Sequence, residues 1–566
     1  MTITDKNTRI IFVFAILILA AVAYGGTFHN GFVWDDETFI VNNPFIHDLS
    51  LWPKYFTTAD SISNDPGLAQ MYRPVQTLSF AIDASIWGNR AGGFHMSSLF
   101  LHVACCIAII FAFSGLIGFI PSAIAACIFA VHPAMSEGVL SLAARGNQLY
   151  TLFALVSLGL FLRITRVFDL RHILSILTML LALFSKEPAV ALIAILPLVQ
   201  TISEQPWNIR TRRPAMLYAP YIIATALFLA ARSAVVDTTS ARAYWGGSLV
   251  STLQMQSKVF VIYLGLLIWP FNLKGRYTIS VPAPFPDPLA IGAVIFNIAL
   301  VILGIILFRR GIKGKLAALG IAWFYISLAP VSNIVPIPGS MMGERFLYFT
   351  FAGLLPLLVG AAQYLEWRRF GKTGIIAVSL VLIAWLVTDI SRTKVWTDNR
   401  TFFTLLSRQE PDDLAVQTHM SSEEISSGNA QSAVTRLERL IKAERSVSAP
   451  PFSKLHYWYG RALLAANRPG DAYREFAVVA KLKPAKDVIL LLAEAAARSG
   501  DFKTARIILE EEIKSTPDND TAWNGLGNIS LMTGDVPAAI SAYRQALAIN
   551  PDNSEANMNL KALKAE

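Results

Sequence analysis

Residues 31–44 read GFVWDDETFIVNNP and follow directly on the first long apolar stretch, residues 10–28. The segment places two adjacent carboxylates, Asp35 and Asp36, where a membrane helix would leave the bilayer. Paired carboxylates at a membrane boundary cost desolvation and mutual repulsion, so the pair indicates a general base or a cation site. For the pair taken alone, a solvated loop with an aspartate helix cap is the alternative interpretation.

The composition predicts a polytopic membrane protein. The chain has 566 residues, of which 54% are hydrophobic and only 15% are charged, and its mean hydropathy is +0.48. Apolar runs of about 20 residues, the length that crosses the hydrocarbon core, recur up to residue 390. The three cysteines all lie inside apolar runs, so neither a disulfide framework nor a zinc site is predicted.

The basic residues predict the topology. The net charge of +9 comes from short clusters between apolar runs, which favours membrane orientation over nucleic-acid binding. With a cytoplasmic N-terminus, every cluster falls on the cytoplasmic side. The clusters are residues 6–9, 163–171, 210–213, 309–315 and 368–372. About eleven crossings are expected, at residues 10–28, 95–117, 120–136, 140–162, 172–185, 187–203, 215–232, 288–308, 315–331, 346–366 and 373–390.

Two apolar segments allow more than one interpretation. A crossing at residues 259–270 would reverse the side of the later basic clusters, so we expect a re-entrant segment or an interfacial helix there. The first apolar run has the basic leader of a signal peptide but no small-residue cleavage site before Asp35, so we expect a retained helix.

Polar residues at the predicted outer helix ends lie at the level of Asp35 and Asp36, beside a long first outer loop at residues 27–94. One such charge alone would indicate a snorkelling side chain or a local ion pair, but several on one face predict a polar cavity. Its cations suit an anionic phosphate, and its carboxylates suit deprotonation of a hydroxyl. The candidate phosphate-binding residues are Arg73, Arg145, Lys186 and Arg345. The candidate supporting residues are His95, His132, Glu137, Asn147, Glu187, Glu344 and Tyr348.

His95 and His102 stand seven residues apart and therefore share one face of a helix. No third ligand follows at a suitable spacing, so hydrogen-bonded packing is favoured over a metal site.

An internal repeat dominates the chain after residue 391, where the composition becomes charged and alanine-rich. The tetratricopeptide positions are matched by Trp523, Leu526, Gly527, Ala539, Tyr543, Ala546 and Pro551, and related residues recur 34 positions earlier. Three clear repeats and a degenerate first one are predicted. The expected domains are residues 1–392, a linker at 393–410, and a repeat α-solenoid at 411–566. Such a solenoid presents a concave surface to peptides or proteins, and a purely structural cap is the alternative.

Seven motifs occur in order: FVWDD, YRPVQTLSF, FHMSSLFLH, HPAMSEGV, ARGNQLY, SKEPA and GERFLYF. Followed by tetratricopeptide repeats, they resemble the transmembrane and tetratricopeptide repeat-containing O-mannosyltransferases over nearly the whole chain. Three departures are evident. The family more often has a His-Thr-Glu where this chain has Met-Ser-Glu, and Ala-Lys-Glu where this chain has Ser185-Lys186-Glu187; the repeat array is also short.

The resemblance implies an all-α membrane bundle of the C-type glycosyltransferase fold, which takes a sugar from a polyprenyl-phosphate carrier. Asp35 matches the catalytic base of the related protein O-mannosyltransferases, and Asp36 matches its acidic neighbour. The expected reaction inverts the anomeric centre and transfers the sugar to Ser or Thr of a protein. No obligatory cofactor is expected, although the carboxylate pair leaves a divalent cation open.

The expected location is a bacterial inner membrane, with the first outer loop and the repeats in the periplasm. Lipid, lipid-linked sugar and a protein bound by the repeats are the expected partners, without nucleic acid. Two alternatives stay open. In the first, the acceptor is lipopolysaccharide or another glycan, and the repeats recruit a partner. In the second, the chain is a non-catalytic membrane scaffold whose buried charges are structural.

Overall fold

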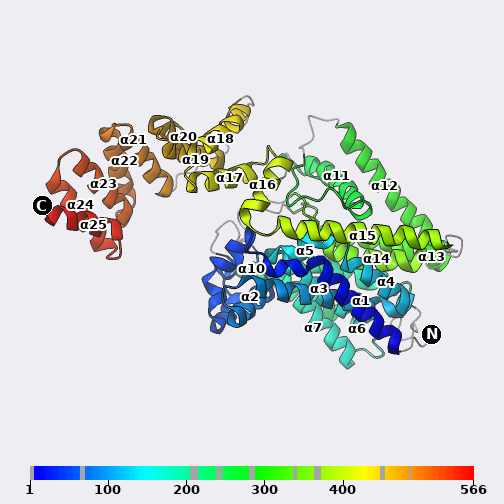
Figure 1. Cartoon of the computed structure of the whole chain (residues 1–566). Helices are drawn as coiled ribbons and strands as arrows, with labels where there is room; N and C mark the ends of the chain where they lie inside the picture. The colour runs from blue at the N-terminus through cyan, green and yellow to red at the C-terminus, as the bar shows by residue number, and fades with distance from the viewer. Residues whose placement is uncertain are drawn as a thin grey trace. The chain divides into compact units, whose positions relative to one another are not determined.

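The computed structural model describes ten parts of the chain, and over these parts the protein is all-α (Figure 1). They are residues 6–63, 71–203, 214–236, 244, 247–279, 287–335, 341–362, 371–445, 453–482 and 486–565. The chain divides into two compact units, residues 1–402 and 403–566. This division falls inside the predicted linker at 393–410, but that segment is largely helical.

The first unit contains the apolar helices. Its main helices are α1 (Lys6–Tyr24), α2 (Pro74–Trp87), α3 (Ala91–Ile117), α4 (Phe119–Ala130), α5 (Ser136–Leu140), α6 (Arg145–Phe161), α7 (Leu170–Ser185), α8 (Leu192–Gln200), α10 (Pro214–Val235), α11 (Leu249–Ile268), α12 (Pro288–Phe308), α13 (Gly311–Leu328), α14 (Leu347–Ala362) and α15 (Gly371–Val395). Helix α16 (Asn399–Gln409) begins in this unit. Short helical turns join them, among them η2 (Glu37–Val41), η7 (Leu142–Ala144), η8 (Glu187–Ala191), η10 (Ala329–Val331) and η11 (Glu344–Phe346).

Large apolar side chains on the outside of this unit identify an integral membrane protein. Helix α12 is the clearest example, because Leu289 is 76% exposed and Ile295 is 62% exposed. Among the described residues, eight helices are long and apolar enough to cross a bilayer, or nine if one bent pair is a single span. The expected number of about eleven crossings therefore stays a prediction.

Two predicted boundaries are corrected by the structure. The crossing expected at 120–136 bends by 67° after α4, because Pro133 has no backbone N–H to continue the helix. The helix expected from residue 140 begins only at Arg145, after the turn η7. Residues 259–270 fall mainly within α11, which is long and apolar enough to cross a bilayer, so the re-entrant or interfacial interpretation stays a prediction. The basic residues 210–213 and 368–369 lie outside the described residues.

The described part of the first outer loop is folded and has a small core of its own. Phe39, Ile46 and Tyr55 of the loop are buried against Phe80 of α2. The buried side chain of Asn43 ties the loop together by donating to the carbonyl oxygens of Ser61 and Ile62, both at 3.1 Å. The polar residues of this loop are therefore part of a packed structure and not of a solvated connection.

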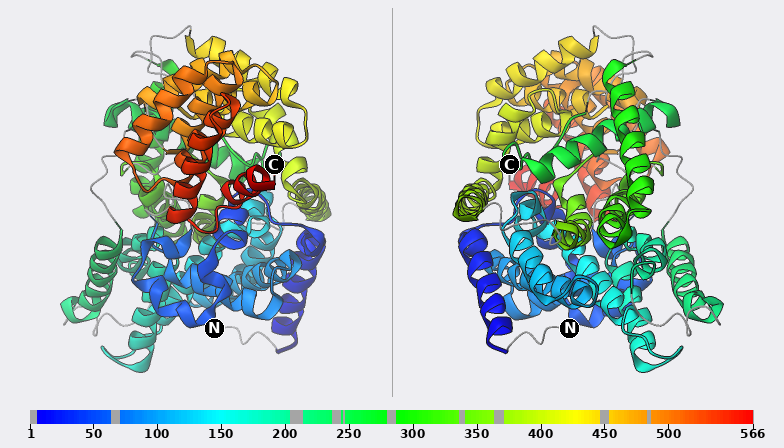
Figure 2. Two further views of the ribbon diagram at one scale, coloured as in Figure 1. Left: turned by 90° about the vertical axis from the view of Figure 1, so that its left-hand side faces the viewer. Right: turned by 90° about the vertical axis from the view of Figure 1, so that its right-hand side faces the viewer.

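The second unit stacks antiparallel helix pairs in chain order, coloured yellow to red in Figure 2. The helices are α17 (Leu414–Ser426), α18 (Ala430–Arg445), α19 (Ser453–Ala465), α20 (Pro469–Leu482), α21 (Lys486–Arg498), α22 (Phe502–Ser515), α23 (Asp520–Met532), α24 (Val536–Ile549) and α25 (Ser554–Ala565). The predicted solenoid is confirmed. Small residues let the paired helices approach closely, as where Gly527 of α23 faces the ring of Tyr543 in α24.

Replacing Gly527 with alanine should destabilise the repeat unit by about 1–3 kcal/mol, because the added methyl group would overlap the buried Tyr543 ring. Gly470→Ala is the matched control, since nothing lies within 4 Å of a methyl group there. Hydrogen exchange of the full-length protein in detergent measures both changes. Equal protection of α23 and α24 in the two variants would contradict this packing.

Candidate functional site

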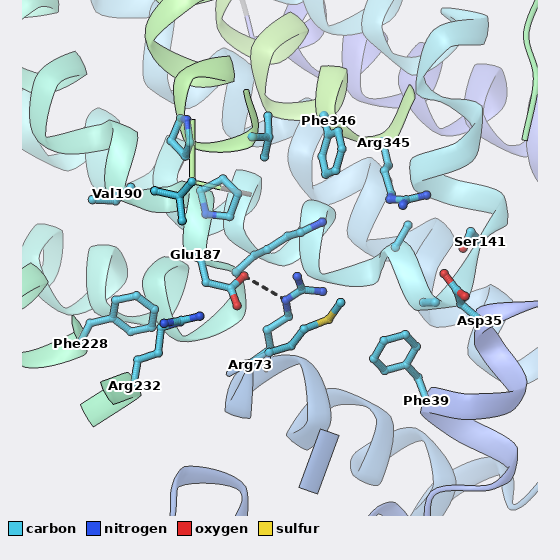
Figure 3. Close-up of a pocket in the computed structure, with 18 of the residues that line it drawn as sticks. Asp35, Phe39, Arg73, Ser141, Glu187, Val190, Phe228, Arg232, Arg345 and Phe346 are labelled. Carbon is cyan, nitrogen blue, oxygen red and sulfur yellow. Dashed lines mark hydrogen bonds and ion pairs between the residues drawn. The ribbon is translucent and has the colours of Figure 1, made fainter. Parts of the chain in front are cut away.

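One pocket of about 430 Å³ opens in the first unit, and segments far apart in sequence line it (Figure 3). Four cationic and two anionic side chains share the lining with apolar residues. The lining comprises Asp35, Phe39, Met71, Arg73, Ser141, Ala143, Ala144, Lys186, Glu187, Pro188, Val190, Phe228, Leu229, Arg232, Pro330, Val331, Val335, Arg345 and Phe346. The structure thus brings together four of the six residues predicted for catalysis and phosphate binding.

Asp35 supplies a carboxylate to this pocket. In Figure 3 it lies on the same side as Arg345, whereas Arg232 and Phe228 lie on the opposite side. Burial disfavours the charged form and raises the pKa of Asp35, while Arg345, Arg276 and Arg73 oppose the rise. A carboxylate with a raised pKa and nearby cations is suited to accept a proton near neutral pH.

Asp36 has a different environment and does not line the pocket. Its fully buried carboxylate accepts backbone N–H groups from Ala143 at 2.7 Å and from Val33 at 3.1 Å. Burial outweighs these bonds and raises the pKa of Asp36 to about 7. Its contacts therefore assign Asp36 a structural role, tying the Asp35 loop to turn η7.

Lys186 places an ammonium group at the pocket, where few polar groups offset its loss of hydration. The side chain is 5% exposed, and Nζ donates to Oδ1 of Asn147 at 2.8 Å. The ring of Phe346 lies beside it, with its centroid 5.3 Å from Nζ. Within the parts of the chain that the structure describes, no carboxylate oxygen is within ion-pair distance of Nζ. Burial and the nearby Arg73 and Arg345 lower the pKa of Lys186, so an anionic ligand in the pocket would favour its charged form.

The two predicted pocket arginines are each held by a carboxylate. Arg73 Nε lies 3.1 Å from Glu187 Oε2. Arg345 pairs with Glu137, which also accepts the Arg345 backbone N–H at 2.8 Å. Because each carboxylate occupies only part of its guanidinium, the remaining N–H groups are available to a ligand in the pocket.

Arg232, at the end of α10, is a pocket residue that the sequence analysis missed. The sequence offers one signal for it, a single arginine ending an apolar helix, and that pattern predicts only the end of a crossing. The wall beside it is apolar, and Leu229 and Val335 are 50% and 71% exposed. The pocket therefore joins a charged region to a hydrophobic one.

Arg145 lies outside the pocket, so its predicted phosphate contact does not fit the structure. The side chain is 1% exposed, forms an ion pair with Asp83 at 2.6 Å, and donates to the Phe94 carbonyl oxygen at 2.8 Å. All of these contacts join α6 to α2 and α3. Arg145 is therefore a buried structural cation, satisfied by its own partners.

The seven predicted supporting residues fall into two groups. Glu137, Asn147 and Glu187 each bond directly to a pocket cation. The other four bond elsewhere: His95 to the Gly31 carbonyl oxygen, His132 to that of Leu267, Glu344 to Arg392, and Tyr348 to His102. His102 also contacts the Ala130 carbonyl oxygen, consistent with packing. Among the described residues, no group of three metal-ligating side chains occurs.

Comparisons with known proteins found matches to both units. A tetratricopeptide repeat family model matches residues 421–486 and 490–554. Protein O-mannosyl-transferase F38B6.6 of Caenorhabditis elegans is 24% identical, covering 65% of this chain and 53% of its own length. Protein O-mannosyl-transferase TMTC3 of Mus musculus is 20% identical, covering 97% and 65%, and TMTC4 of Homo sapiens is 22% identical, covering 74% and 64%.

The chain is related to the TMTC proteins. This relation confirms the resemblance that the ordered motifs indicated. The chain spans between about half and two thirds of the length of these three relatives. Among solved structures, one described as the APC/C hetero-tetramer Cut9–Hcn1 matches 92% of this chain and 95% of its own at 14% identity, with a TM-score of 0.25.

Asp36→Ala should lower the free energy of unfolding by about 1–3 kcal/mol, because the buried N–H groups of Val33 and Ala143 would lose their acceptor. Thermal unfolding of the purified protein at pH 8 measures this loss. Asp35→Ala is the control, and it should change stability little because, among the described residues, no buried backbone N–H depends on the Asp35 carboxylate. Equal stabilities for the two variants would contradict the assignment of Asp36.

Proposed function

We propose that the protein transfers a sugar from a polyprenyl-phosphate carrier to Ser or Thr hydroxyl groups of a protein, with inversion at the anomeric carbon. The observation that carries this proposal is the joint presence of Asp35, the buried Lys186 ammonium and an apolar wall in one pocket. The names of the TMTC relatives support protein O-mannosyl transfer, and the choice of mannose here rests on those names alone.

The reaction is a single displacement. The carboxylate of Asp35 accepts the proton of the acceptor hydroxyl as that oxygen bonds to the anomeric carbon. The bond from the anomeric carbon to the phosphate oxygen breaks from the opposite face, so the lipid leaves as a monophosphate and the configuration inverts. The proton stays on Asp35 until it passes to water.

The cations of the pocket stabilise the leaving phosphate. Lys186 provides a point charge, and Arg73 and Arg345 provide forked N–H donors. Their fixed positions mean that little reorganisation is needed as charge develops on the phosphate. Because the lipid phosphate is already a good leaving group, we propose that no metal ion is required.

The polyprenyl chain would lie along the apolar wall formed by Phe228, Leu229 and Val335. We place the pocket on the non-cytoplasmic side of a bacterial inner membrane, since the basic clusters orient the N-terminus to the cytoplasm. The repeats would then present the acceptor protein on the same side.

Asp35→Asn should abolish transfer while donor binding and folding persist, because an amide cannot accept the hydroxyl proton. Lys186→Met should lower donor use about a hundredfold, since one fixed phosphate contact is lost. Transfer of radiolabelled sugar from a purified lipid-linked donor to envelope protein measures both effects. Lys54→Met, an exposed site in the outer loop, serves as the control. Normal transfer by Asp35→Asn would show that Asp35 is not the base. Label found in a glycan and not in protein would show that the acceptor is a glycan.

Transfer should fall on the acid side at a pH above the usual aspartate range. Only deprotonated Asp35 can act as the base, and burial raises its pKa in the folded protein. The rate therefore declines as pH decreases through this raised pKa and reaches a plateau above it. A pH profile of kcat/KM measures the position of this limb. A limb near pH 4, the ordinary value for aspartate, would contradict a desolvated base.

A further inference from the structure

Trp34, the residue directly before Asp35, has a backbone conformation that is unusual for an aromatic residue. Its φ is +57°, in the left-handed region that favours glycine. Such a conformation persists only where the surrounding contacts enforce it, and it often occurs at functional sites. Because the peptide after Trp34 leads into Asp35, this conformation sets the direction in which the Asp35 side chain leaves the backbone.

Asn399 provides the contact that enforces it. Its Oδ1 accepts the backbone N–H of Trp34 at 2.7 Å, and its Nδ2 donates to Glu37 Oε1 at 2.6 Å. These two bonds bracket Asp35 on both sides. The Trp34 ring also packs against Phe402, with centroids 5.6 Å apart. Asn399 is the first residue of α16 and lies 365 positions from Trp34 in sequence.

Neighbouring bonds hold the same segment to the end of α15 and the turn after it. The Gly31 backbone N–H donates to the Thr397 carbonyl oxygen at 2.8 Å. Asn30 Nδ2 donates to the Thr393 carbonyl oxygen at 3.0 Å. Residues 30–37 are therefore held along one side by residues 393–399, while Asp36 ties the other side to turn η7.

We propose that Asn399 is a positioning residue for Asp35, whose side-chain amide holds residues 34–37 so that the Asp35 carboxylate enters the pocket. The inference rests on the function proposed for Asp35. Asparagine suits this position because one amide accepts the Trp34 N–H and donates to Glu37 at the same time. Alanine offers neither group, and aspartate offers only acceptors and would face the Glu37 carboxylate.

Without this amide, Trp34 is expected to relax to a negative φ, which rotates the following peptide and withdraws the Asp35 carboxylate. Asn399→Ala should then lower kcat roughly ten- to a hundredfold, because small displacements of a catalytic group have large effects on rate. The KM for the lipid-linked donor should change little, since Lys186 and the arginines are unaffected. A more hydrated Asp35 should also move the acid limb of the pH profile to lower pH.

A swap of partners separates this role from general stability. Asn399→Asp alone should impair transfer, because two carboxylates would then face each other. Adding Glu37→Gln restores a donor opposite the new acceptor, so the double variant should return to within about threefold of the wild-type kcat. Thr401→Ala is the control, since within the described residues the side-chain hydrogen bond of Thr401 goes to Asp398, next to α16, and not to the Asp35 loop.

Hydrogen exchange of the peptide containing residues 30–37 gives a second measurement that needs no substrate. Asn399→Ala should speed exchange there, and the double variant should restore protection. Wild-type exchange and wild-type kcat in Asn399→Ala would overturn the inference, as would failure of the double variant to recover either. If the wild-type protein transfers no sugar, the proposed function fails, and exchange alone then decides whether Asn399 orders the loop.

Discussion

The structure depends on how it accommodates a positive charge inside an apolar protein. The Lys186 ammonium is almost fully buried, and its described contacts are one amide oxygen and one aromatic ring. Burying a charge with so few partners is unfavourable, so the surrounding fold must stabilise it or a ligand must neutralise it. The guanidinium groups of Arg73 and Arg345 raise this cost, and Glu187 and Glu137 reduce it by pairing with them. The result is a site with unused capacity for an anion.

Interrupted helices make this arrangement possible. The break at Pro133 leads the chain to Glu137, and the break before Pro188 places Lys186 and Glu187 at the start of a short turn. A third turn, η11, carries Arg345 ahead of α14. Each interruption moves polar side chains to one end of the bundle without placing them in the middle of an apolar helix. The outer loop then covers this end and contributes Asp35.

Much of this site could be predicted from the sequence because it depends on local patterns. Polar motifs at helix ends, read with the side given by the basic clusters, were enough to group Asp35 with Lys186 and Arg345. The repeats were equally accessible, since a 34-residue period leaves a direct trace in the sequence. In both cases neighbouring residues carry the information.

The remaining assignments depend on distant partners that no local pattern encodes. Asp36 differs from Asp35 because its carboxylate accepts the backbone N–H groups of Val33 and of Ala143, which lies 107 residues away. The sequence around Arg145 is equally consistent with a ligand-binding arginine, and only the structure shows that Asp83 pairs with it. Arg232 was overlooked because an arginine at a helix end usually anchors the helix at the membrane surface. The sequence therefore predicts where these residues lie along the chain, but not the direction in which their side chains point.

The apolar wall of the pocket has a practical consequence for handling the protein outside its membrane. Leu229 and Val335 are largely exposed beside the charged end, so an alkyl chain with a polar head matches both parts. Many extraction detergents have this shape, and anionic ones would also pair with Lys186. We expect solubilised preparations to contain bound surfactant at this position, where it would compete with the lipid-linked sugar proposed as the donor.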